Sequence, residues 1–233
     1  MGDADDLPDP ALGVFDTLLV RGGRAVDLES HVDRLAGSVR ELYDVPVDAV
    51  ALSGRIRADA EPLGTARVRT SYDPVGGEWL IDARRIEEPG LDPRTLTPRR
   101  VAGGLGRHKW VDRRLLADPG DADDVLLVDD SGGLLECGAA NVFLVVDGVV
   151  VTPPLDGRIL PGTTRARVLA ALRRHDAAAA ERPVALAELA RATEVCATSA
   201  IRGVQPVIAC SEVATWPIGP TTTWLRERLA GAV

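Results

Sequence analysis

One lysine stands out as a residue that could do chemistry. Among the 27 basic residues of this 233-residue chain, 26 are arginines and Lys109 is the single lysine. An arginine keeps its proton past about pH 12 and forms no Schiff base, whereas a partly desolvated lysine can attack a carbonyl carbon. Lys109 follows Gly104 and Gly106 and precedes Trp110, so the backbone permits close approach and an apolar wall is at hand. The context favours a Schiff-base lysine over the alternative, a solvent-exposed lysine at a loop end.

Residues 160–165 read Leu-Pro-Gly-Thr-Thr-Arg and predict the start of a helix. The backbone N–H groups at such a start, together with the hydroxyls of Thr163 and Thr164, could bind a phosphate. An ordinary helix start is the alternative interpretation. The chain has no Gly-x-x-x-x-Gly-Lys-Ser/Thr sequence, so a nucleotide-hydrolysing phosphate loop is not indicated.

Glu136 is a carboxylate within a largely apolar stretch, residues 134–143. Burying a carboxylate is costly unless it is paired, and a protonated ring nitrogen would be a suitable partner. The small residues 138–140 would let a flat ligand lie close to the backbone, although they also fit a tight bend. A glutamate at a solvated hairpin end is the alternative.

The three features fit one ligand: an aldehyde for Lys109, a phosphate for the helix start and a basic ring nitrogen for Glu136. Pyridoxal 5′-phosphate carries all three groups. The sequence resembles the class IV, fold type IV pyridoxal-phosphate enzymes, most closely the aminodeoxychorismate lyases. The resemblance extends from about residue 13 to residue 207, and it rests on ordered markers: residues 13–17 (GVFDT), 31–35 (HVDRL), Lys109, 136–143, 152–154, 160–165 and 194–207.

The resemblance implies a role for individual positions. Lys109 would be the Schiff-base lysine and the general acid/base, and Glu136 would pair with the pyridine nitrogen. The phosphate would be held by Arg34, by the helix start and by the loop at the end of a later strand. His31 is one helical turn from Arg34 and would orient it, or would lie at the surface. The remaining predicted cofactor residues are Thr163, Thr164, Ser199 and Ala200, and the candidates for substrate contact are Phe15, Thr17, Arg107 and Asn141.

The reaction implied first is that of a lyase, which converts 4-amino-4-deoxychorismate to p-aminobenzoate and pyruvate for folate synthesis or a secondary pathway. The run at residues 136–141 and the Thr-Ser-Ala at residues 198–200 resemble the lyases more than the aminotransferases. The alternative is a class IV aminotransferase acting on a D- or branched-chain amino acid. A cofactor-binding protein without catalysis is a third possibility, against which the retained Lys109 argues.

Two domains must position these residues. Residues 14–20, 25–28, 66–72 and 79–85 are strand-like, and residues 30–43 and 48–60 favour helices, which predicts a smaller N-terminal α+β domain in residues 1–100. Residues 101–233 predict a larger cofactor-binding domain, with a four-stranded meander at residues 125–152. After it we expect a helix that begins at residues 161–164, a shorter helix over residues 185–192, strands at residues 194–198 and 205–210, and a closing helix over residues 222–230. Prolines and glycines in residues 87–107 indicate the connection. The fold class is therefore α/β, more exactly a two-domain α+β chain. The resemblance implies fold type IV, with a shortened N-terminal strand because only twelve residues precede Gly13.

Composition limits the remaining functions. The formal net charge of −8 argues against a broad basic face for nucleic acid. No apolar run is long enough to span a bilayer, and the acidic start is unlike a secretion signal, so we expect a cytoplasmic protein. The spacing of the cysteines at positions 137, 196 and 210 favours buried small side chains over a disulfide framework or a metal site. The resemblance also implies a homodimer.

Overall fold

The structure is a computed structural model that describes residues 7–90 and 92–230, and these residues form two compact units. The first unit holds Leu7–Pro89 together with His108–Leu115. The second unit holds the described residues of 90–107 and of 116–230. The chain is therefore not divided by a single cut near residue 100, because two short segments on either side of residue 107 belong to opposite units.

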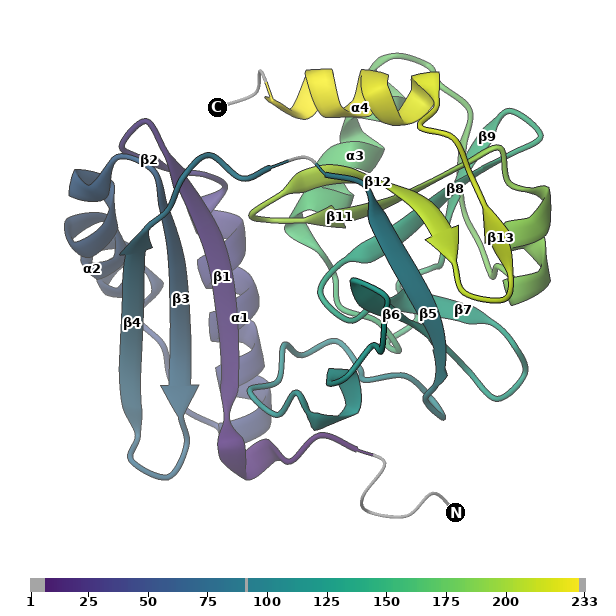
Figure 1. Cartoon of the computed structure of the whole chain (residues 1–233). Helices are drawn as coiled ribbons and strands as arrows, with labels where there is room; N and C mark the ends of the chain where they lie inside the picture. Colours follow the sequence, from purple (N-terminus) through teal and green to yellow (C-terminus); the bar gives the residue numbers. More distant parts are fainter. Residues whose placement is uncertain (1–6, 91, 231–233) are drawn as a thin grey trace. The chain divides into compact units, whose positions relative to one another are not determined.

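The first unit is a four-stranded sheet with two helices behind it in Figure 1. The strand order is β2-β1-β3-β4, and all neighbouring pairs are antiparallel. The elements are β1 (Val14–Arg21), β2 (Arg24–Ala25), α1 (Leu28–Tyr43), α2 (Ala49–Ala60), β3 (Ala66–Asp73) and β4 (Glu78–Arg85).

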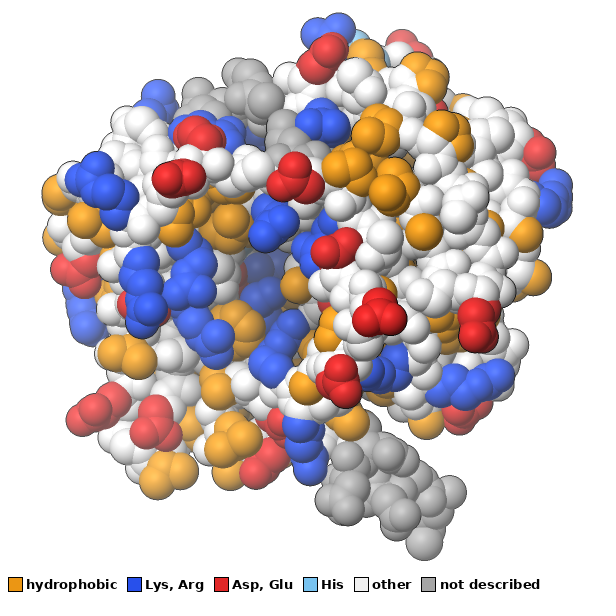
Figure 2. All heavy atoms as spheres, viewed as in Figure 1, with side chains coloured by type: hydrophobic (Ala, Val, Ile, Leu, Met, Phe, Trp, Pro, Cys, Tyr) orange, Lys and Arg blue, Asp and Glu red, His pale blue; other side chains and the backbone are white. Residues whose placement is uncertain are grey.

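The two faces of this sheet differ in chemistry, as the period of two along each strand requires. One face contributes Leu18, Val20 and Val68 to an apolar core with residues of both helices, among them Val32 and Ile56. The other face carries the alternate positions of β1 and β3. In Figure 2, basic side chains gather over β3 and β4 on this open face, and the basic residues of these two strands are all arginines.

The second unit is built on a larger sheet with the order β10-β9-β8-β11-β12-β5-β6-β7, and β13 pairs with β12. Most pairs are antiparallel, but β5 is parallel to both of its neighbours, and β10 is parallel to β9. Its strands are β5 (Arg94–Arg100), β6 (Asp124–Val128), β7 (Leu134–Cys137), β8 (Asn141–Val146), β9 (Val149–Thr152), β10 (Ala179–Glu181), β11 (Glu194–Ser199), β12 (Gly203–Cys210) and β13 (Ala214–Thr215).

Two helices cover one side of this sheet, α3 (Thr163–Arg174) and α4 (Pro220–Ala230). Val168, Leu172 and Leu225 of the helices pack with Phe143 and Cys196 of the sheet. A second apolar cluster is formed mostly by side chains of the strands themselves and includes Leu126, Leu144 and Trp216. Both units mix helices with strands, which confirms the predicted fold class.

Three predicted elements are wrong in detail. Residues 125–152 do not form a four-stranded meander, because β7 and β8 lie at different places in the sheet order. The connection predicted at residues 87–107 contains β5, whose Pro98 lies beyond the last residue paired with β12 and so needs no N–H on that side. The helix predicted over residues 185–192 is a 3-10 helix at Leu186–Arg191.

The cysteines are buried free thiols, as predicted. Burial raises the pKa of Cys196 to about 12 and that of Cys210 to about 11, and it also raises the pKa of Cys137.

Among residues 7–90 and 92–230, every helix is too short or too polar to cross a bilayer. The same ranges contain no cluster of three or more histidine, cysteine or acidic side chains that could hold a metal ion.

Candidate functional site

The main chain around Lys109 is fixed to β1. The Phe15 N–H donates to the Lys109 carbonyl at 2.8 Å, and the Val111 N–H donates to the Gly13 carbonyl at 3.0 Å. Gly13 has a φ of +88°, and a Cβ there would collide with the Tyr72 carbonyl oxygen. Only glycine therefore lets β1 begin where it meets the lysine segment.

The residue before the lysine ties the same segment to α1. His108 Nδ1 lies 3.0 Å from Ser38 Oγ, and His108 Nε2 lies 3.6 Å from a carboxylate oxygen of Glu41. Ser38 Oγ in turn donates to the Arg34 carbonyl. The His108 ring meets the Trp110 ring edge-on, with centroids 5.4 Å apart. The position of Lys109 is thus set from both β1 and α1.

Three cationic groups surround the buried ring of Phe15. The guanidinium carbon of Arg69 lies 3.7 Å from the ring centroid, Lys109 Nζ lies at 5.1 Å and the guanidinium carbon of Arg113 at 5.9 Å. Burial, and then the charge of Arg67, lower the pKa of Arg69. Cations gathered around one apolar ring repel one another, so an anion bound among them would be stabilised.

Arg34, predicted to hold a phosphate, is anchored on its own unit by a buried carboxylate. Its Nε and Nη2 donate to the two oxygens of Asp16, each at 2.9 Å. His31 Nδ1 lies 2.7 Å from the same carboxylate, and its side chain is 3% exposed. His31 is therefore not a surface residue, and it contacts the same carboxylate that binds Arg34.

In the second unit, Glu136 lies on β7 with its side chain buried. The Leu160 N–H donates to the Glu136 carboxylate at 3.2 and 3.3 Å, and Asn141 Nδ2 donates to it at 3.3 Å. Hydrogen bonds of this kind favour the charged form of a carboxylate. Asn141 also donates to the Leu160 carbonyl at 3.0 Å, so the buried amide of Asn141 supports Glu136 and the turn before α3.

The start of α3 follows that turn directly. Its N-cap is Gly162, where no side chain accepts a hydrogen bond from the helix and where a Cβ would strike the Asn141 amide. Thr163 and Thr164 are the first two residues of the helix, and Thr164 is buried. The fold thus brings Glu136 and the predicted phosphate-binding helix start together through Asn141.

The end of β11 also lies next to Asn141, because Thr198 of β11 is paired with Asn141 of the neighbouring strand β8. Thr198 Oγ1 donates to the Asn141 carbonyl at 3.4 Å. Ser199 and Ala200 follow at the turn, where Ser199 Oγ accepts from the Arg202 N–H. Each of these contacts lies within the second unit.

The predicted substrate residues fall in both units. In the first unit, Phe15 and Thr17 share the open face of the sheet, and Thr17 pairs directly with Arg69. In the second unit, Arg107 is exposed, and Asn141 is buried beside Glu136. Sequence analysis missed Arg69 and Arg113. The alternation of arginines at positions 67 and 69 in a half-buried strand was the available signal for Arg69.

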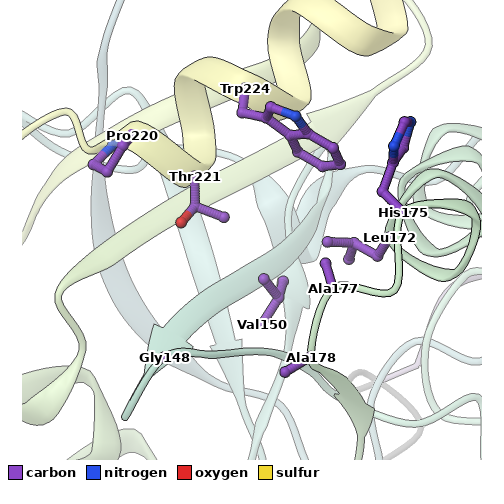
Figure 3. A pocket seen from close by; sticks show the side chains of 9 residues that line it. All are labelled: Gly148, Val150, Leu172, His175, Ala177, Ala178, Pro220, Thr221 and Trp224. Carbon is purple, nitrogen blue, oxygen red and sulfur yellow. The ribbon is translucent and has the colours of Figure 1, made fainter.

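A cavity of about 520 Å³ lies elsewhere in the second unit, and Figure 3 shows it between α4, the C-terminal end of α3 and β9. Trp224 and Thr221 of α4 face Val150 and Leu172 across it. None of the predicted site residues lines this cavity. This cavity is therefore separate from the residues that we expect to bind the cofactor and the substrate.

The chain is similar to known proteins in both sequence and structure. Residues 104–210 match the family described as Amino-transferase class IV. A Methanocaldococcus jannaschii protein provisionally named a branched-chain-amino-acid aminotransferase is 25% identical, over 93% of this chain and 85% of its own length.

A Mycobacterium tuberculosis protein named bifunctional aminodeoxychorismate lyase / D-amino acid transaminase is 32% identical over 66% of each chain. The crystal structure of 4-amino-4-deoxychorismate lyase from Pseudomonas aeruginosa is similar, with a TM-score of 0.79 and 28% identity, over 95% of this chain and 91% of that chain.

Proposed function

We propose that this chain, a pyridoxal-phosphate-dependent enzyme similar to the class IV aminotransferases, is a lyase that converts 4-amino-4-deoxychorismate to p-aminobenzoate and pyruvate. The coarser activity, that of a class IV lyase or aminotransferase, follows from the family. The choice of the lyase rests on the residues around Lys109.

The residues present fit the cofactor. Glu136 is a buried carboxylate held by N–H donors, as a partner of a protonated ring nitrogen should be. The start of α3 has a glycine N-cap, which suits a phosphate. When bound, pyridoxal phosphate supplies an aldehyde for amine exchange and a protonated ring that withdraws electrons. We assign its binding to Lys109 and Glu136, and its phosphate to the residues Arg34, Thr163, Thr164, Ser199 and Ala200.

The arginines around Phe15 carry the proposal for the substrate. Each of the two products contains one carboxylate, so the substrate contains two. Arg69, Arg113 and the amine of Lys109 all lie beside the ring of Phe15. In this partly desolvated place, each of the two arginines could bind one substrate carboxylate. A branched-chain amino acid has one carboxylate and an apolar side chain, which this cationic group suits less well.

The amine of Lys109 would then move the protons. It would take the proton from the carbon that bears the substrate amine, and the enolpyruvyl group would leave with the electron pair of its C–O bond. A proton returned to the departing group yields pyruvate, and the ring becomes aromatic as p-aminobenzoate. No keto acid is consumed.

A class IV aminotransferase is the second candidate, because the M. tuberculosis relative carries D-amino acid transaminase in its name. The two activities differ in their need for a keto acid. The purified chain, saturated with pyridoxal phosphate, should release p-aminobenzoate and pyruvate in equal amounts from fresh 4-amino-4-deoxychorismate with no keto acid present. Amino transfer from D-alanine to 2-oxoglutarate, with no p-aminobenzoate released in the first assay, would instead establish the aminotransferase.

A further inference from the structure

Asp16, His31 and Arg34 form a network of hydrogen bonds inside the first unit. Asp16 is on β1, and the other two residues are one turn apart on α1. The side chains of Asp16 and His31 are 5% and 3% exposed, and that of Arg34 is 11% exposed. A cavity lined by Asp16 and His31 measures about 10 Å³, close to the volume that one water molecule needs. The side chains therefore have little room to change rotamer.

The geometry fixes the plane of the Arg34 guanidinium. Two parallel N–H···O bonds of 2.9 Å to one carboxylate restrain both the position and the tilt of the group. Burial acts to raise the pKa of Asp16, but the charge of Arg34 and the hydrogen bond to His31 hold it well below its usual value. Asp16 accepts hydrogen bonds from two of the five N–H donors of the arginine.

His31 restrains the carboxylate in turn. With Nδ1 2.7 Å from Asp16 Oδ1, the ring limits rotation of the carboxylate about its last bond. His31 therefore restrains the carboxylate of Asp16, and this carboxylate in turn restrains the guanidinium of Arg34.

From this arrangement we infer that Asp16 and His31 are positioning residues, which orient Arg34 to bind the phosphate of the cofactor. The inference rests on the role proposed above for Arg34, and it does not depend on which reaction the enzyme catalyses. Neither Asp16 nor His31 needs to touch the cofactor. The effect of changing either residue should therefore be confined to ligands that carry a phosphate.

Pyridoxal, which lacks the phosphate, makes this testable. The dissociation constants of pyridoxal phosphate and pyridoxal are measured from the absorbance of the protein-bound compounds, for the native chain and for Asp16→Asn, His31→Ala, His31→Asn and Arg34→Gln. We expect both Asp16→Asn and Arg34→Gln to weaken the binding of pyridoxal phosphate by about tenfold or more, with little change in the binding of pyridoxal. His31→Ala should have a smaller effect of the same kind, and His31→Asn, which keeps an N–H near Nδ1, should restore part of it.

The matched control is Glu29→Gln on the same helix, whose carboxylate pairs with Arg57 at an exposed position. It should change neither constant. Equal weakening of both compounds by Asp16→Asn would overturn the inference, since that result indicates general damage to the unit. An unchanged ratio in Arg34→Gln would also overturn it, whereas absence of p-aminobenzoate release would bear only on the proposed reaction. If Asp16→Asn fails to fold, the His31 pair decides by the same ratio.

Discussion

Asp16 of the first unit and Glu136 of the second are buried carboxylates that are held in different ways. In the first unit, Asp16 is bound by side chains, the guanidinium of Arg34 and the ring of His31. In the second unit, Glu136 accepts from the Leu160 N–H and the Asn141 amide, and Glu194 accepts from the Thr221 and Thr222 N–H groups at the start of α4.

The difference matters for function. A carboxylate that binds a cationic side chain fixes the position of that cation. A carboxylate that is held by amides keeps a negative charge that can act on a ligand, because amides are neutral donors. The first unit therefore suits the placement of positive groups, and Glu136 in the second unit suits a protonated ring.

The largest effect should come from removing the amine of the first unit. Lys109→Arg keeps a positive charge beside Phe15 but forms no Schiff base, so turnover should fall below detection while the thermal unfolding midpoint changes little. Product release and calorimetry are the measurements. Turnover near the native rate would remove Lys109 from the chemistry.

Glu136→Gln tests the negative charge in the second unit. The amide is nearly the same size, so the cofactor should still bind, but the rate should fall by about a hundredfold because the ring nitrogen loses its partner. Glu194→Gln is the matched control, since Glu194 is also buried and held by amides. It should lower stability and leave kcat unchanged, and an equal fall in both variants would count against a specific role for Glu136.

Arg69→Gln tests the substrate side of the first unit. Loss of one charge-assisted contact should raise KM for 4-amino-4-deoxychorismate by about tenfold. Arg67→Gln is the control on the same strand, because Arg67 is paired with Asp82 at 3.1 Å. Steady-state kinetics of both variants distinguish a specific contact from a general loss of positive charge, which would affect the two alike.

The smallest effect concerns stability alone. Asp129 accepts from the N–H groups of Ser131 and Gly133 and from Arg158, and these bonds lower its pKa from 3.8 to about 2, the hydroxyl of Ser131 contributing most. A carboxyl with a depressed pKa stabilises the fold above its unfolded pKa, and this contribution is lost as the pH falls through about 2. Asp129→Asn should cost about 1–3 kcal/mol in urea unfolding at pH 7 and show a smaller dependence on acid pH than the native chain. A parallel dependence would place the acid sensitivity at other groups.

Local patterns were enough to predict much of this fold. The strand-like runs predicted at residues 14–20, 66–72 and 79–85 are β1, β3 and β4, and the helices predicted at residues 30–43 and 48–60 and from residues 161–164 are α1, α2 and α3, within a few residues. The order of the larger sheet was not accessible in this way. Pairing of β5 with β12 depends on contacts between distant segments, and the prolines near β5 indicated a loop.

In the candidate site, too, local sequence patterns predicted some features, and contacts between distant segments set the others. The single lysine, the glutamate in an apolar run and the Pro-Gly-Thr-Thr helix start are visible in the composition and order of residues. The partnership of Asp16 with Arg34, and the arrangement of Arg69 and Arg113 around Phe15, need strand register and side-chain rotamers. Those are set by packing across elements, which a single sequence does not report.

The place of β5 in its sheet has a consequence for how the protein folds. Every strand of the first sheet lies within residues 14–85, so that sheet can pair as soon as this part of the chain has been synthesised. In the second sheet, Arg94 of β5 pairs with Val207 of β12, so one side of β5 waits for more than a hundred further residues. Such long-range parallel pairing is slow, and unpaired strand edges promote aggregation. The second sheet is therefore the part of the nascent chain most exposed to misassembly before synthesis is complete.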